Sequence, residues 1–316
     1  MGTVGAALSD SFDELYGWRI LSGCGAGALL AAINAVIASA LAPARIYGLA
    51  TLAACSITGV LTVVMPRFVE TLGPSGYYST LVVLTCLVAG FVFLVPSHMG
   101  NNTVTRKSAM PKQGSSAEGM MLLLGVFIIG VAMMAYYAFI ERLGARLELS
   151  LEAIGLILTG MMVGSAVGAG CAAFLGQRVG IVKPLLLVTT LHALVVVVAV
   201  VTTQRWLFAC AVIGQGLLYM FMFPFLLALA AKLDIAGRWA AAASGASFLS
   251  FGVGPLVGGW LILQWGYEAI TWLMIAATIL CLLIFLWVGR RIENSFDIHD
   301  SVVGSVEINR GKKLNY

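Results

Sequence analysis

The sequence predicts an all-α protein whose helices cross a membrane about nine times. Of the 316 residues, 60% are hydrophobic and only 10% are charged, and the mean hydropathy is +1.00. Soluble chains average about 45 to 50% apolar and about 25% charged residues. Most of the 36 glycines lie within the apolar runs, where they let helices approach one another closely in lipid. These observations argue against a soluble enzyme, a fibrous protein or a disordered chain.

A membrane-spanning helix needs about 20 mostly apolar residues, and nine runs meet this requirement. Charges, prolines or glycine clusters bound each run. The predicted spans are 18–41, 46–66, 76–96, 119–140, 153–175, 183–202, 206–231, 238–263 and 269–289.

The connections between these spans divide the chain. Most are short, but the polar stretch from Ser97 to Glu118 separates three spans from six. We therefore expect an N-terminal bundle of three helices over 1–96, a cytoplasmic linker over 97–118, a six-helix bundle over 119–292, and a cytoplasmic tail over 293–316.

The basic residues predict the orientation, because short loops rich in Lys and Arg stay in the cytoplasm. One side of the predicted topology carries thirteen of them: Arg45, Arg106, Lys107, Lys112, Arg178, Lys183, Lys232, Arg238, Arg290, Arg291, Arg310, Lys312 and Lys313. The other side carries five: Arg19, Arg67, Arg142, Arg146 and Arg205. The linker and the C-terminus are therefore expected in the cytoplasm and the N-terminus outside. The net charge of +4 indicates topology rather than a nucleic-acid partner.

The chemically reactive residues do not form a site for catalysis, metal or cofactor binding. Six cysteines lie in apolar stretches without close spacing and are expected to be small buried hydrophobes: Cys24, Cys55, Cys86, Cys171, Cys210 and Cys281. No nucleophile and base pair, carboxylate dyad, phosphate-binding loop or metal-ligand set has usable spacing. The first 17 residues lack the basic start of a signal peptide.

An internal repeat relates the two ends of the chain. Gly23-Cys24-Gly25 in the first span matches Gly214-Gln215-Gly216 in the seventh, so spans one to three resemble spans seven to nine. Spans four to six have no upstream counterpart. If the parent architecture is two six-helix halves, three helices are missing and residues 1–8 are the tail of a severed helix. A short natural extension is the alternative.

Three motifs carry a family resemblance. Leu15–Ala26 looks like a fourth-helix signature, with Ser22 where Gln is usual. Gly252–Gly259 contains a Gly-Pro-x-x-Gly-Gly element, and Leu175–Gly180 looks like a degenerate loop motif in which Gln177 replaces Asp. With these motifs the chain resembles the major facilitator superfamily from its fourth helix to its twelfth. The Gly-Pro element lies on the penultimate helix, and its absence from the second span does not favour a proton antiporter.

The motif residues have functional and structural interpretations. Gly254, Pro255, Gly258 and Gly259 form either a hinge for rocking or a static packing point, since proline bends a helix and glycine permits close contact. The resemblance also singles out a loop motif of three residues: Gln177, Arg178 and Gly180.

Charged residues at the predicted outer side are candidates for the ion pathway. The resemblance implicates Arg19 in proton coupling, whereas the alternative is an interfacial Arg that snorkels to water. Tyr137 and Glu141 share a helix face, and the resemblance places their span beside the central cavity. Glu141 then binds a substrate cation or a proton, or it pairs with Arg142 or Arg146.

Polar residues within the spans are candidates for solute binding. Gln215 and Tyr219 lie at near-helical spacing on the seventh span, and Asn34 lies on the first, which the resemblance places opposite. Such groups orient a small amphiphilic solute, or they form interhelical hydrogen bonds. His192 stands alone in a valine-rich span and is expected to be structural.

The sequence therefore predicts a secondary active transporter of a small organic solute, and not an enzyme. Two helix bundles would rock about a midplane site, driven by an ion or solute gradient, with a proton or another ion as the expected coupling ion and efflux slightly favoured by the resemblance. The expected location is the inner or plasma membrane, with the lipid bilayer as a partner and no cofactor. The alternative is a transport-incompetent remnant or a membrane interaction subunit.

Overall fold

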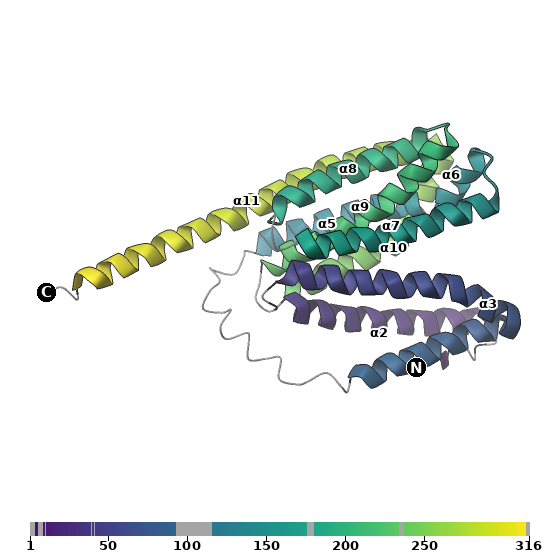
Figure 1. The fold of residues 1–316 in the computed structure, drawn as a ribbon, viewed down its shortest axis with the longest axis horizontal. Coiled ribbons are helices and arrows are strands. Elements are labelled where there is room, and N and C mark those ends of the chain that lie inside the picture. Colours follow the sequence, from purple (N-terminus) through teal and green to yellow (C-terminus); the bar gives the residue numbers. More distant parts are fainter. Residues whose placement is uncertain are drawn as a thin grey trace.

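The computed structural model describes residues 4–5, 9, 11–38, 40, 42–92, 116–175, 180–233 and 237–313. Within these ranges the side chains of residues 12, 16, 19, 62–78, 88–89, 91–92 and 293–313 are not described. The described residues form helices and no strands (Figure 1). The helices are α2 (Phe12–Ala38), α3 (Pro43–Val92), α5 (Ser116–Tyr137), α6 (Ile140–Arg146), α7 (Leu151–Leu175), α8 (Val182–Val201), α9 (Arg205–Ala231), α10 (Arg238–Trp265) and α11 (Glu268–Lys313). The predicted all-α class is confirmed.

Eight described segments are long and apolar enough to cross a membrane. They correspond to the predicted spans other than the third, with ends that differ by a few residues. The helix that contains the first span, α2, begins at Phe12, six residues before the predicted start of the span. The third span, 76–96, falls on the second part of α3 and continues into residues 93–96, outside the described part of the chain. The prediction of about nine spans is consistent with these helices.

One difference from the prediction is that a single helix of 50 residues, α3, is assigned over both the second and the third predicted spans. Figure 1 shows α3 changing direction partway along, so that its second leg runs back the opposite way. Proline and glycine mark the expected break, but membrane helices tolerate these residues as bends. A second difference is α11, whose 46 residues extend well past the predicted span and out of the bundle.

Glycines hold α7 and α9 close together within the six-helix unit formed by α5 and α7 to α11. A Cβ atom placed on Gly164 would lie 2.8 Å from the Ile213 carbonyl oxygen. One placed on Gly216 would lie 2.5 Å from the Met161 carbonyl oxygen and 2.8 Å from the Ser165 hydroxyl. Backbone therefore packs on backbone at this crossing, as small residues permit in lipid.

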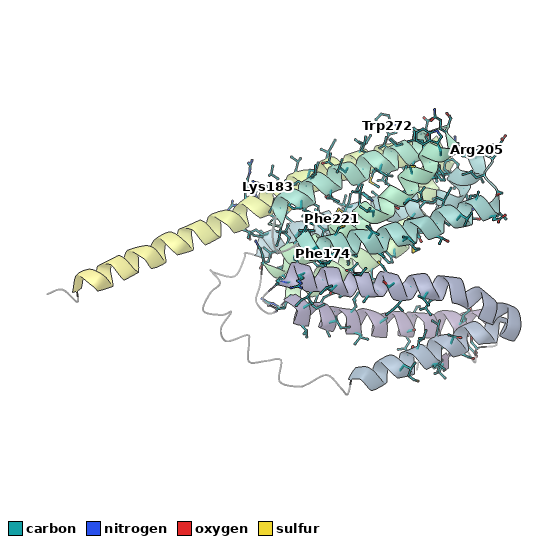
Figure 2. The ribbon with its side chains drawn as sticks, viewed as in Figure 1. Phe174, Lys183, Arg205, Phe221 and Trp272 are labelled. Carbon is teal, nitrogen blue, oxygen red and sulfur yellow. The ribbon has the colours of Figure 1, made fainter. Side chains whose placement is uncertain are left out.

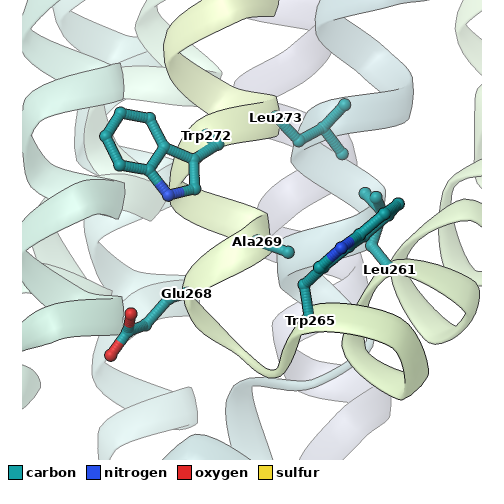
Figure 3. A pocket seen from close by; sticks show the side chains of 6 residues that line it. All are labelled: Leu261, Trp265, Glu268, Ala269, Trp272 and Leu273. Carbon is teal, nitrogen blue, oxygen red and sulfur yellow. The ribbon is translucent and has the colours of Figure 1, made fainter.

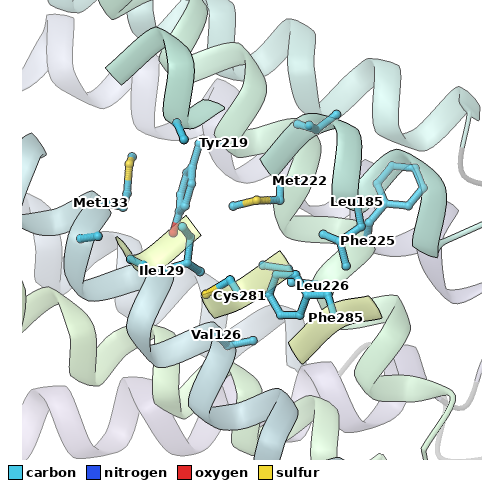
Figure 4. Close-up of a cluster of buried hydrophobic side chains, with 14 of the residues drawn as sticks. Val126, Ile129, Met133, Leu185, Tyr219, Met222, Phe225, Leu226, Cys281 and Phe285 are labelled. Carbon is cyan, nitrogen blue, oxygen red and sulfur yellow. The ribbon is translucent and has the colours of Figure 1, made fainter. Parts of the chain in front are cut away.

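Large apolar side chains fill the space between α5, α8, α9 and α11 (Figure 4). Phe225, Phe285 and Met222 are fully buried there, and the Phe221 and Phe225 rings stack with centroids 5.1 Å apart. The Cys281 thiol donates to the Gly125 carbonyl oxygen at 3.2 Å. This core packs α5, α8, α9 and α11 together.

The prediction of six buried cysteines was wrong for most of them. Cys281 is buried, Cys55 is half-buried and the other four are exposed. The physical reason is the solvent, because a position that faces lipid is as apolar as one that faces the protein core. An apolar neighbourhood in the sequence therefore does not distinguish the two.

Candidate functional site

The molecule has two ends, which Figure 2 marks by labelled side chains. Lys183, at the start of α8, lies at one end, and Arg205 and Trp272 lie at the other. We call these the Lys183 end and the Arg205 end. Asn34, near the last turn of α2, lies towards the Lys183 end, since its neighbour Ala35 packs against Gly237 at the start of α10.

A buried hydrogen-bonded group joins α2 and α3 to the six-helix unit near the Lys183 end. The Asn34 side-chain amide donates to the Ser244 hydroxyl of α10 at 2.6 Å. The Tyr47 hydroxyl of α3 donates to the Asn34 carbonyl oxygen at 2.7 Å. Asn34, Tyr47 and Ser244 are 5% exposed or less. We call these three residues the junction.

Close backbone contact surrounds the junction. Gly237 adopts a left-handed φ of 70° at the N-cap of α10, and a Cβ atom there would lie 2.8 Å from the Cα atom and carbonyl oxygen of Ala35. A Cβ atom on Gly48 would lie 2.6 Å from the Ala173 nitrogen of α7. Larger residues at either position would force α2 and α3 away from the six-helix unit at this end. The steric contacts alone therefore require glycine at both positions.

The first half of α2 has few neighbours among the described residues. Trp18, Ile20 and Leu21 are exposed. Added Cβ atoms at three glycines would meet nothing within 4 Å: Gly23, Gly25 and Gly27. The contact between α2 and the six-helix unit is therefore concentrated near the Lys183 end, and α2 is uncovered towards the Arg205 end.

A second polar group lies inside the six-helix unit. The Gln215 side-chain amide of α9 donates to the Met133 sulfur of α5 at 3.0 Å. The Tyr219 ring lies 5.9 Å from the His192 ring of α8, centroid to centroid. Among the described residues, the Gln215 side-chain oxygen Oε1, both His192 ring nitrogens and the Tyr136 hydroxyl are buried without a hydrogen-bond partner. Such atoms are costly in an apolar interior and are often satisfied by water or a ligand.

The structure divides the predicted solute-binding residues between these two groups. Asn34 contacts α3 and α10, whereas Gln215 and Tyr219 face α5 and α8. Within the described part of the chain, no hydrogen bond or ring contact joins Asn34 to Gln215 or Tyr219. Interhelical hydrogen bonding, the structural alternative, is what the geometry shows for Asn34.

The charged candidates lie at the Arg205 end. Tyr137 and Glu141 are exposed, and neither Arg142 nor Arg146 forms an ion pair with Glu141 in the described structure. Their guanidinium groups instead lie over aromatic rings, Arg142 over Phe139 at 5.4 Å and Arg146 over Tyr267 at 4.8 Å. The salt bridge seen among the described residues joins Arg205 to Glu148 at 3.0 Å.

The Gly-Pro element packs α10 against α5. A Cβ atom on Gly258 would lie 2.9 Å from the Ala135 carbonyl oxygen, and one on Gly254 would collide with the Met134 side chain. Pro255 lies inside α10, which continues through it, and Gly259 has Phe139 at 3.6 Å from an added Cβ. These contacts show a packing point within one unit. Its role as a hinge stays a prediction.

Several of the predicted site residues lie outside the part of the chain that the structure describes. Gln177 and Arg178 of the loop motif are not described, while Gly180 is exposed with a φ of 70°. Arg19 lies on α2, but its side chain is not described. The described residues contain no group of three or more His, Cys, Asp or Glu side chains that could hold a metal ion.

Sequence reasoning missed Ser244 and Tyr47, the partners of Asn34. The available signal was the run of small residues around Ser244, from Ala240 to Ala246, which permits a close helix approach. Nothing in that run identifies α2 as the helix that approaches, because Asn34 and Ser244 are 210 residues apart.

The chain resembles known proteins both in sequence and in fold. A family model described as Major Facilitator Superfamily matches residues 122–298. The crystal structure of the human organic anion transporter MFSD10 (TETRAN) is similar with a TM-score of 0.70 at 17% sequence identity, covering 91% of this chain and 74% of that one. No curated protein matches the sequence. The likeness to the solved structure concerns the fold.

Proposed function

The chain belongs to the Major Facilitator Superfamily and is a membrane transporter rather than an enzyme, and we propose that it carries a small organic solute by alternating access. In this mechanism two helix bundles rock about a central site and expose it to each side in turn. The proposed bundles are an N-terminal one within residues 1–96 and the six-helix bundle of 119–292, connected by the linker 97–118 and followed by the tail 293–316.

One observation carries the proposal: contact between α2 and the six-helix unit is concentrated at one end. The junction closes the Lys183 end with buried hydrogen bonds, while the first half of α2 is exposed towards the Arg205 end. A carrier needs an interface that can close on one side while the other side is open, and a hydrogen bond of modest strength between units can break and re-form.

The proposed orientation follows the distribution of Lys and Arg. The Lys183 end and the C-terminus would be cytoplasmic, in the inner or plasma membrane. The conformation described would then be closed on the cytoplasmic side. We favour export over uptake and a proton or other ion gradient as the driving force, with Arg19 and Glu141 as the ionisable groups of the pathway.

Flux across a reconstituted membrane tests this function. The protein would be placed in liposomes with an imposed pH gradient, with carboxyfluorescein as the first probe, since the similar solved structure is an organic anion transporter, and ethidium as a cationic probe. We expect Arg19→Ala and Tyr219→Ala to abolish gradient-driven flux while expression stays normal. Unchanged flux in both variants would refute the assigned pathway.

A second candidate function is supported by the uncovered part of α2. In the internal repeat, Gly25 corresponds to Gly216, which packs tightly on α7, whereas Gly25 meets nothing within 4 Å. This face of α2 is thus suited to another helix, as in a transport-incompetent membrane interaction subunit that binds a partner there. Flux by the 316-residue chain alone would eliminate this alternative.

A further inference from the structure

A pocket of about 410 Å³ lies at the Arg205 end, around the turn between α10 and α11 (Figure 3). Six residues line it: Leu261, Trp265, Glu268, Ala269, Trp272 and Leu273. None of them belongs to the junction or to the polar group around Gln215. The pocket is therefore separate from the residues assigned to solute transport.

The lining combines two aromatic rings with one negative charge. Trp265 and Trp272 are 64% and 70% exposed, and Glu268 is the one ionisable side chain of the six. Trp272 lies four residues after Glu268, so the two share a face of α11, as Figure 3 shows. Indole faces and a carboxylate together attract an organic cation, above all an ammonium group.

The carboxylate of Glu268 is available for such a cation. No salt bridge to Glu268 is found in the described structure, where Arg205 pairs with Glu148 instead. The nearby Arg146 guanidinium lies over the ring of Tyr267 at 4.8 Å and does not line the pocket. As the first residue of α11, Glu268 also stabilises the helix dipole, and any test must separate that role from binding.

The depth of the lining residues selects the kind of ligand. Trp265 ends α10 and Glu268 begins α11, so both lie at the membrane surface. Leu261 and Trp272 are each four residues further along a span, about 6 Å towards the bilayer centre. The pocket is thus charged and aromatic at the headgroup level and apolar below it, which matches a phospholipid better than a soluble amine.

We propose that this pocket binds an ammonium-bearing phospholipid headgroup. The ammonium lies against the Glu268 carboxylate and the Trp272 ring, which share one side of α11, and the acyl chains descend along the apolar part of the span. An anionic headgroup without an ammonium is disfavoured, because its phosphate would face the carboxylate without compensation. The proposal does not depend on which solute the protein carries.

Native mass spectrometry of the full chain tests the proposal with two probes of identical acyl chains, phosphatidylcholine and phosphatidylglycerol. We expect the wild type to retain phosphatidylcholine about fivefold better, which is within the range of cation–π and carboxylate contributions at partly exposed sites. Trp272→Ala and Glu268→Gln should each bring the two lipids towards equal retention.

Matched controls are available at the same end of the molecule. Trp206→Ala removes another exposed tryptophan (65% exposed), and Glu152→Gln removes the exposed first-turn carboxylate of α7; both should keep the preference. If Glu268 only caps the helix, Glu268→Gln destabilises α11 equally with either lipid, and the preference for phosphatidylcholine is kept. A preference that is kept in this variant therefore overturns the proposal. Equal retention by the wild type also overturns it, as does full displacement of the lipid by free choline at equal concentration.

Discussion

Breaking the junction should shift the protein towards a state that is open at the Lys183 end. The hydrogen bond from Asn34 to Ser244, at 2.6 Å between buried side chains, is a direct polar link between α2 and α10. Interhelical hydrogen bonds in membrane proteins contribute about 0.6 kcal/mol on average and about 1.7 kcal/mol at most. Since about 1.4 kcal/mol corresponds to a tenfold change in an equilibrium, losing this bond should change the closed-to-open ratio by roughly threefold to sixteenfold.

A double-mutant cycle isolates the contribution of this bond. Asn34→Ala, Ser244→Ala and the double variant would be compared with the wild type. Asn34→Ala leaves the Tyr47 hydrogen bond intact, because that bond goes to the Asn34 backbone. Ser247→Ala is the matched control, since the buried Ser247 hydroxyl donates only along its own helix, to the Ala243 carbonyl oxygen.

The assay is a distance distribution between spin labels at two exposed positions of the Lys183 end, Arg45→Cys and Arg290→Cys. The five cysteines other than the buried Cys281 would be replaced by Ala. The population at longer distance should grow in each junction variant and stay unchanged in Ser247→Ala. A coupling energy indistinguishable from zero, or an equal shift in the control, would refute the assignment of this contact as a closing element.

Three further substitutions, two of them with a matched glycine control, test the helix packing and the role of a buried histidine. Gly216→Leu should lower the melting temperature in detergent, because a Cβ atom at this position would lie 2.5 Å from a backbone oxygen and overpacking costs about 1 to 3 kcal/mol. Gly25→Leu is the control and should be tolerated, because a Cβ atom there meets nothing within 4 Å. Gly258→Val should likewise destabilise the fold and Gly252→Val should not; equal melting temperatures would contradict the packing role. His192→Leu should leave flux unchanged and match or exceed wild-type stability, because it removes a buried ring whose nitrogens lack partners among the described residues; loss of flux with a normal melting curve would instead assign this residue to transport.

The residues of the candidate site show how far sequence reasoning reached. Asn34, Gln215 and Tyr219 stood out as polar side chains within apolar runs, and each is buried in the structure. Their grouping was not predictable, because a hydrogen bond between α2 and α10 depends on which helices are adjacent in space. The sequence contains no local signal for that adjacency, only the small residues that permit it.

The length and apolarity of the runs by themselves determined that this chain is a bundle of membrane helices, and the motifs determined its family. The cost of burying unpaired backbone groups in lipid forces each long apolar run into a helix, so this conclusion needs no tertiary information. Only the tertiary structure decided which face of each helix is inside. Lipid and protein interior are equally apolar, and hydropathy therefore cannot separate the exposed Cys171 from the buried Cys281. Close steric fit, such as that of Gly216 against α7, and directional hydrogen bonds, such as that of Asn34 with Ser244, make the choice.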